Sequence, residues 1–144
     1  MTRPLFRWTL TTIVALSAAP FIIPIQSLAD APQEEWKAPA RAARKKNPVA
    51  ADGKSVAAGK VIYSAQCLSC HGPLGHGDGP AAKDLTPKPR NLSDPKIQEQ
   101  TDGSIFWKLT EGKKPMPTFE KLISEDDRWN VINYVRTFRG KEGK

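Results

Sequence analysis

The stretch Cys67-Leu68-Ser69-Cys70-His71 decides the fold of this chain. Two thiols three positions apart can each add across one vinyl group of a haem, and the histidine that follows can then bind the iron. The chain of 144 residues contains only two cysteines and two histidines, so the motif uses both thiols and one imidazole. The motif therefore predicts one covalent haem c, attached through Cys67 and Cys70, with His71 as an iron ligand.

Two other chemistries use the same spacing of cysteines. A thioredoxin-like dithiol belongs in a βαβ pattern, which the sequence around Cys67 lacks. A structural zinc site needs four ligands, and beyond the motif only His76 remains. His76 follows His71 so closely that its loop would have to cross to the opposite haem face to reach iron. We therefore expect His76 to be a surface loop residue, and we favour haem attachment.

The chain begins like an exported protein. Two arginines precede an apolar run over residues 8–25 that has no charged residue, and small side chains follow up to Ala29. We predict a signal peptide over residues 1–29, cleaved after Ala29, and hence a periplasmic protein. The alternative is an uncleaved membrane anchor over residues 8–25, although two prolines interrupt this run. Contact with the membrane is expected only in that case.

Residues 30–52 are rich in Ala, Pro, Lys and Arg and have no apolar periodicity. We expect a solvated linker here; the alternative is an extension that wraps against the domain with Trp36 docked. The whole chain has 22 basic and 15 acidic residues. Nucleic-acid binding is not expected, because acids are interspersed with the basic residues and no stacking aromatic side chains are interleaved with them. The folded domain is predicted to span residues 53–144.

Two helices are predicted to close this domain. The first is capped by Asp52 or Ser55 and continues to Gln66, directly before the motif. Gly59 lies inside this helix at a cost of about 1 kcal/mol relative to alanine, so we expect another helix to approach it closely. The second helix is capped by Ser124. Its apolar stripe consists of Val131, Tyr134, Val135 and Phe138.

Met116 provides an independent test of the haem prediction. It lies between Pro115 and Pro117, after a helix predicted over residues 103–111, so it does not belong to a helical core stripe. A thioether is a soft, neutral ligand that suits haem iron opposite an imidazole. The alternative for a lone methionine is a gap-filling place in the core. We predict that Met116 binds the iron opposite His71.

Three further residues are candidates for the haem site. The carbonyl group of Pro89, or as second choice that of Pro87, can accept a hydrogen bond from the His71 ring and so orient the imidazole. Arg90 can pair with a haem propionate, the alternative being a solvated surface arginine. Trp107 can donate its indole N–H to a propionate, the alternative being simple packing in the domain.

In order and spacing, these motifs resemble those of the bacterial monohaem class I cytochromes c. The resemblance covers most of the chain after residue 52 and is carried by Ala57–Tyr63, Cys67–Gly72, Gly77–Pro80, Pro87–Arg90, Met116–Phe119 and Trp129–Arg136. It implies an all-α fold of three to five helices around one haem c. It also implies thioether bonds from Cys67 and Cys70, iron ligation by His71 and Met116, and a contact of Gly59 with Val131 and Tyr134.

Ligation on both haem faces leaves the iron no open site, so we expect a one-electron carrier without catalytic residues. The protein is expected to be a monomer that docks acidic redox partners through a basic rim. The rim would consist of Lys83, Lys88, Arg90, Lys113 and Lys114. One alternative is a fixed haem subunit of a larger oxidoreductase, with the basic extension as an assembly element. Another is a haem peroxidase or sensor with an open iron position.

Overall fold

The computed structural model describes residues 36–141, which lie within one compact unit spanning residues 35–144. The predicted signal peptide falls outside the described residues. Within residues 36–141 the chain forms helices and loops, with one isolated β-bridge and no strand. The prediction of an all-α fold is therefore confirmed. No helix among these residues is both long and apolar enough to cross a membrane.

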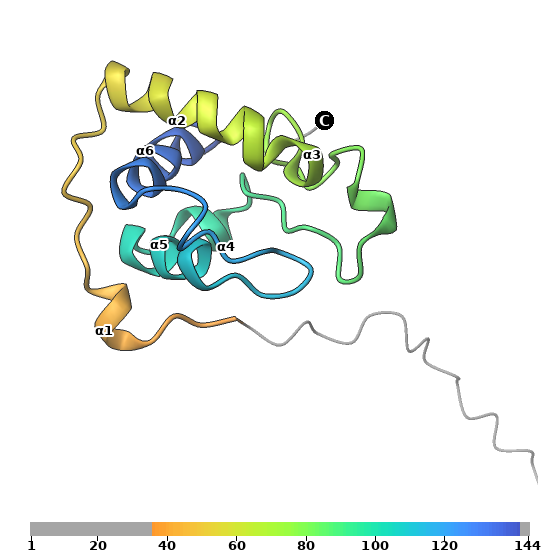
Figure 1. Ribbon diagram of the computed structural model, residues 1–144, viewed down its shortest axis with the longest axis horizontal. Helices are drawn as coiled ribbons and strands as arrows, with labels where there is room; N and C mark the ends of the chain where they lie inside the picture. The colour runs from red at the N-terminus through yellow and green to blue at the C-terminus, as the bar shows by residue number, and fades with distance from the viewer. Residues whose placement is uncertain (1–35, 142–144) are drawn as a thin grey trace, which may run out of the picture. The chain divides into compact units, whose positions relative to one another are not determined.

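Helix α2 (Gly53–Gln66) begins where the sequence predicts. The Asp52 carboxylate accepts a hydrogen bond of 2.8 Å from the Ser55 amide, which satisfies one of the N–H groups that a helix start leaves without a partner. The short helix α3 (Leu68–His71) follows after Cys67, whose own N–H still bonds back to the last turn of α2. The cysteines and the histidine therefore lie at the end of helix α2, which is followed directly by α3 (Figure 1).

Helix α6 (Glu125–Arg136) packs across α2 (Figure 1). Gly59 marks the point of contact. A Cβ atom at Gly59 would lie 2.0 Å from the carbonyl oxygen of Asn130 and 2.9 Å from the Cβ of Tyr134. Only glycine permits this approach. The predicted contact between the first and last helices of the domain is confirmed, with the backbone of Asn130 rather than Val131 as the nearest neighbour.

Helix α5 (Asp102–Glu111) packs against α6 and confirms the helix predicted before Met116. The Thr101 hydroxyl caps its start by accepting a hydrogen bond of 3.2 Å from the Ser104 amide. Gly112 ends the helix with a φ of 67°, a conformation that favours glycine. The segment between α3 and α5 contains only short helices, η2 (Ala82–Asp84) and α4 (Pro95–Gln98).

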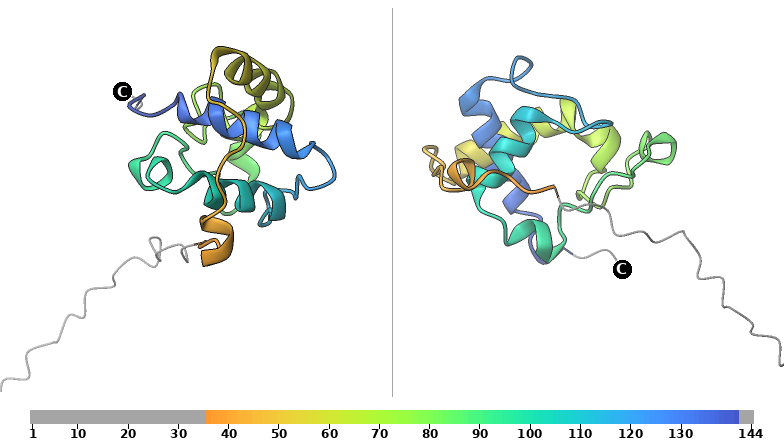
Figure 2. Two further views of the ribbon diagram at one scale, coloured as in Figure 1. Left: turned by 90° about the vertical axis from the view of Figure 1, so that its left-hand side faces the viewer. Right: turned by 90° about the horizontal axis from the view of Figure 1, so that it is seen from below.

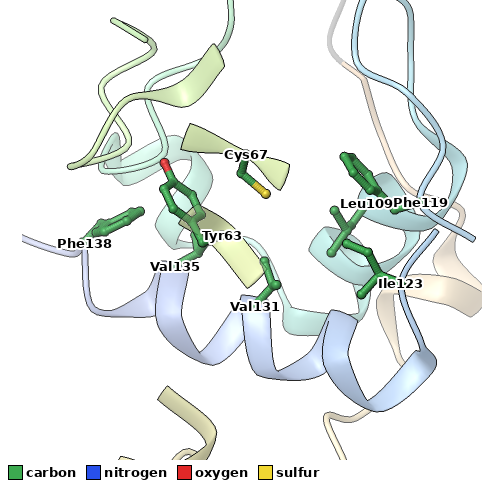
Figure 3. Close-up of a cluster of buried hydrophobic side chains, with 8 residues drawn as sticks. All are labelled: Tyr63, Cys67, Leu109, Phe119, Ile123, Val131, Val135 and Phe138. Atoms are coloured by element: carbon green, nitrogen blue, oxygen red, sulfur yellow. The ribbon is translucent and has the colours of Figure 1, made fainter. Parts of the chain in front are cut away.

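Two clusters of buried side chains form the core. The first, which we call the Cys67 cluster, consists of Tyr63, Cys67, Leu109, Phe119, Ile123, Val131, Val135 and Phe138 (Figure 3). The second, the Trp129 cluster, consists of Phe106, Trp129 and Ile132. In the second cluster the rings of Phe106 and Trp129 are stacked with their centroids 3.9 Å apart. Helices α5 and α6 contribute side chains to both clusters, so they connect the two parts of the core.

Residues 36–52, which we call the arm, pack on the helices, so the prediction of a solvated linker is wrong for this part. Helix α1 (Ala40–Ala43) lies against α5 (Figure 2). A Cβ atom at Gly103 of α5 would lie 2.3 Å from the carbonyl oxygen of Ala42, so this glycine allows the close contact. The Trp36 ring lies 6.0 Å from that of Trp107, as the alternative prediction of a docked Trp36 requires.

Polar contacts also connect the arm to the crossing of α2 and α6. The Asn47 side-chain amide donates to the Asn133 side-chain oxygen at 2.8 Å, and Asn133 donates to the Ser55 hydroxyl at 2.8 Å. Asn133 and Ser55 are buried, so these hydrogen bonds matter for stability. The packing of the arm could not be predicted from apolar periodicity, because isolated side chains and backbone carbonyl groups hold it and no apolar stripe does.

Candidate haem site

The two cysteines of the motif lie in different surroundings. The Cys67 side chain is buried and that of Cys70 is half-buried, and the two form no disulfide bond. Burial raises the pKa of the Cys67 thiol to about 12, and the neighbouring Cys70 adds to the rise. Figure 3 shows the Cys67 sulfur pointing between Tyr63 and Val131 on one side and a second group of side chains on the other. That second group consists of Leu109, Phe119 and Ile123.

His71 is oriented by a backbone carbonyl group. Its Nδ1 atom lies 3.3 Å from the carbonyl oxygen of Arg90. Since a carbonyl oxygen can only accept, Nδ1 carries the proton and Nε2 has its lone pair free to bind a metal. Burial lowers the pKa of His71, and the hydrogen bond to Arg90 partly opposes this effect. The imidazole is therefore kept neutral, which is the form that ligates iron.

The carbonyl group that faces His71 is not the predicted one. The prediction named Pro89 first and Pro87 second, whereas the acceptor belongs to Arg90. The Pro89 carbonyl oxygen faces the 72–80 loop instead, where a Cβ atom at Gly77 would lie 2.3 Å from it. Successive carbonyl groups of an extended chain point to opposite sides, so one residue of error exchanges the partners. The Arg90 side chain is exposed, and its contact with a propionate stays a prediction.

The loop after His71 folds back on the motif. The Tyr63 hydroxyl donates to the carbonyl oxygen of Gly72 at 2.7 Å. Gly79 lies so close to α3 that a Cβ atom would be 2.4 Å from the carbonyl oxygen of Ser69. His76 has Nδ1 at 3.4 Å from the Ser93 hydroxyl oxygen, which agrees with a place in the loop. These contacts fix the loop against the residues that carry the two thiols.

Met116 packs against the Cys67 cluster and is half-buried. Its amide donates to the carbonyl oxygen of Lys113 at 2.9 Å, closing a tight turn just after α5. The turn lies close to the end of α5, since a Cβ atom at Gly112 would be 2.4 Å from the carbonyl oxygen of Pro117. The structure thus brings Met116 and Cys67, which are far apart in the sequence, to one apolar cluster.

Sequence reasoning missed Arg128, which holds the chain that follows Met116. Its Nη1 atom donates to the carbonyl oxygens of Phe119, Glu120 and Ile123 at 3.2, 2.8 and 3.0 Å. The residue is buried, and its guanidinium carbon lies 5.1 Å from the centre of the Phe106 ring. One signal was available: Arg128 precedes Val131 by three residues and therefore shares the buried face of α6.

Trp107 faces the arm and does not belong to the Cys67 cluster. Its ring packs against Trp36 of the arm. Leu109, two residues further along α5, belongs to the Cys67 cluster. Two residues turn a helix by about 200°, so Trp107 faces away from that cluster. The hydrogen bond from Trp107 to a propionate stays a prediction, and the contact with Trp36 agrees with the alternative of packing within the domain.

The donor set fits a covalently bound haem. Cys67 belongs to the Cys67 cluster and the Met116 thioether packs against it, while Cys70 and His71, with Nε2 available, follow Cys67 in α3. Thiols suit thioether attachment, and the imidazole and thioether suit axial ligation of iron. Cys67 and Cys70 would hold the porphyrin, and His71 and Met116 are the available axial ligands.

Comparisons with known proteins agree with one covalently bound haem c. A family described as cytochrome c oxidase, cbb3-type, subunit III matches residues 54–135. A cytochrome c6 of Rippkaea orientalis is 34% identical over 55% of this chain and 67% of the relative. A cytochrome c6 of Euglena gracilis is 31% identical over 57% of this chain and 91% of the relative.

A solved structure shares the fold. A chain of the Kuenenia stuttgartiensis reducing HAO-like protein complex superposes with a TM-score of 0.59 at 31% identity. The match covers 64% of this chain and 47% of the other, so less than half of that chain is represented here. The region that matches the family begins after the arm.

Proposed function

The chain belongs to the family of class I c-type cytochromes with one covalent haem c, and on this premise we propose that it is a one-electron carrier with His71 and Met116 as axial ligands. The haem supplies a reversible change between ferric and ferrous iron. One observation carries the proposal: Met116 packs on the same cluster as Cys67, while the His71 ring is fixed with Nε2 available.

The surroundings of both ligands suit electron transfer rather than catalysis. His71 is held by the Arg90 carbonyl, and the residues after Met116 are held by Arg128. Ligands that are held in this way stay in place when the charge of the iron changes, so little rearrangement accompanies each transfer. The apolar side chains of the Cys67 cluster and the thioether favour the ferrous state and raise the reduction potential.

Binding of carbon monoxide tests the ligation without reference to any partner. We expect the ferrous protein to bind carbon monoxide weakly, because Met116 occupies the sixth position. Rapid binding of one carbon monoxide per haem would show an open iron position and would favour the peroxidase or sensor alternative. His76→Ala serves as a control, since removal of a loop histidine should leave carbon monoxide binding unchanged.

A basic rim is proposed to dock acidic redox partners. Its members are exposed side chains in the segments near His71 and Met116: Lys83, Lys88, Arg90, Lys113 and Lys114. Two small oxidants of opposite charge test the rim. Added salt should slow oxidation by anionic hexacyanoferrate(III) and should not slow oxidation by cationic tris(phenanthroline)cobalt(III). Equal salt dependence with both reagents would contradict the proposal.

We further propose that the protein is exported to the periplasm, as its N-terminal sequence predicts. Mass spectrometry of the periplasmic protein, with cleavage after Ala29 as the expected result, tests this. The alternative of a fixed haem subunit has one observation in its favour, which is the packed arm outside the family match. Copurification with a membrane complex would support that alternative over a diffusing carrier.

A further inference from the structure

We propose that the arm and α5 form a second docking surface, separate from the basic rim, which binds an acidic segment of a partner protein. The arm lies outside residues 54–135, the part that matches the family, so it is an addition to the haem domain. The proposal does not depend on which side chain occupies the sixth position of the iron.

The arm has a fixed conformation that a simple tether does not require. Its backbone is held at Ala43, whose carbonyl oxygen accepts a hydrogen bond of 2.7 Å from the Thr101 hydroxyl. Its side chains are held at both ends, by Trp36 on Trp107 and by Asn47 on Asn133. The surface that α1 presents is therefore preorganised, which lowers the cost of binding a partner.

A groove of about 520 Å³ lies between α1 and α5. Its lining combines apolar and cationic side chains: Pro39, Arg41, Ala42, Arg44, Lys45 and Trp107. Lys45 forms an ion pair with Glu125 at 2.6 Å. Arg41 and Arg44 are exposed and form no ion pair with another residue in the range 36–141. Lys46, the next residue but one, is also exposed. The groove thus has an apolar floor and two guanidinium groups available to a ligand.

The complement of this groove is a peptide segment that carries carboxylates around an apolar side chain. Guanidinium groups bind carboxylates through paired hydrogen bonds, which would orient the segment, and the apolar side chain would cover Trp107. Binding to a bilayer is favoured by exposed large apolar side chains that insert into it. Those of the described residues are Val61, Leu74 and Leu122, and none of them belongs to the arm or to α5. We therefore favour an acidic protein segment over an anionic membrane.

The second surface lies away from the haem-binding motif. In Figure 1 and in the right-hand view of Figure 2, α5 lies between α1 and α3. Within α5, Leu109 contributes to the Cys67 cluster and Trp107 faces the arm. A partner bound at the arm would leave the basic rim free, so the protein could stay attached to one protein while it exchanges electrons with another.

The test uses the full holoprotein and a short peptide of glutamates with one central leucine. We expect the peptide to shift the amide and indole NMR signals of the arm and of Trp107. Calorimetry should show that the double variant Arg41→Glu, Arg44→Glu binds the peptide with an affinity lower by about tenfold or more. The matched control is Lys113→Glu, Lys114→Glu, which changes the net charge equally and removes part of the rim; the arm and Trp107 signals should still respond to the peptide as in the wild type.

Two controls separate this proposal from the carrier function and from misfolding. The Arg41→Glu, Arg44→Glu variant should keep the wild-type rate of oxidation by hexacyanoferrate(III), and its Trp36 and Trp107 indole signals should be unchanged without peptide. The neutral variant Arg41→Gln, Arg44→Gln should also weaken binding, to a smaller extent.

Three results would overturn the proposal. The first is equal weakening by the arm and rim variants, which would show attraction by net charge alone. The second is absence of peptide binding to the wild type. The third is binding of phosphatidylglycerol vesicles that depends on Arg41 and Arg44 while the peptide does not bind, since this would assign the surface to a membrane.

Discussion

His71 and Met116 reach the same part of the molecule on segments of opposite kind. His71 ends α3, which follows α2 after the single residue Cys67, so its place follows from helices that the local sequence determines. Met116 lies in a loop, residues 113–123, whose place depends on α5 and α6. One ligand is thus positioned by neighbours in sequence, and the other by contacts between distant residues.

The largest effect is expected at Gly59, because both segments depend on the contact of α2 with α6. In Gly59→Ala the new Cβ would lie 2.0 Å from the carbonyl oxygen of Asn130, and this backbone atom cannot move without separating the helices. We expect the free energy of unfolding to fall by about 3 kcal/mol or more, with both ligands affected together. Denaturant unfolding followed by circular dichroism measures this loss.

Gly53→Ala is the matched control, since no atom lies within 4 Å of a Cβ placed there. It should be as stable as the wild type or more stable by up to about 1 kcal/mol, as expected for alanine in a helix. Equal unfolding midpoints for the two variants would show that the helices do not meet closely at Gly59.

A smaller and more local effect is expected at Arg128. Arg128→Met would remove the side-chain donor from the carbonyl groups of Phe119, Glu120 and Ile123, of which that of Phe119 keeps backbone amide donors, at a cost of about 2–3 kcal/mol. Because these groups belong to the Met116 loop, the weak sulfur-to-iron absorption band of the ferric protein should disappear on warming before the helical circular dichroism signal changes.

Arg128→Lys tests the cause of that effect. A single nitrogen, Nη1, shares its two N–H groups among the three carbonyl oxygens, and an ammonium group offers three N–H donors from one nitrogen. Lysine should therefore restore part of the stability of the band. If the band and the helical signal are lost together in Arg128→Met, the residue supports the whole fold rather than the Met116 loop.

The same contrast explains what could be predicted from the sequence. The caps of α2, α5 and α6 were predictable because short-range chemistry determines them. The close contact at Gly59 was predictable because a glycine inside a helix is costly and indicates a close neighbour. The role of Arg128 was not, since its three acceptors lie in a loop without periodicity. The wrong choice of Pro89 instead of Arg90 as the acceptor for His71 has a similar cause. The sequence pattern locates an extended segment but does not show which of its carbonyl groups faces inward. The docked arm depends on single residues such as Asn47 and Trp36, which leave no repeating signal.

The smallest effect is expected at Thr118, whose hydroxyl donates to the carbonyl oxygen of Thr110 at 2.6 Å. This hydrogen bond connects the Met116 loop to α5, but Thr118 is exposed and water can replace its donor. Thr118→Val should cost about 0.5–1 kcal/mol and lower the temperature at which the sulfur-to-iron band is lost. Thr118→Ser keeps the hydroxyl and should match the wild type; an equal loss in both variants would exclude the hydrogen bond as the cause.

Replacement of Met116 by alanine tests the central claim most directly, because the proposed carrier function requires a sulfur ligand opposite His71. The ferric variant should lose the sulfur-to-iron band, its reduction potential should fall, and its ferrous form should bind carbon monoxide readily. A variant with the wild-type visible spectrum and the wild-type potential would contradict the assignment of Met116 as the sixth ligand.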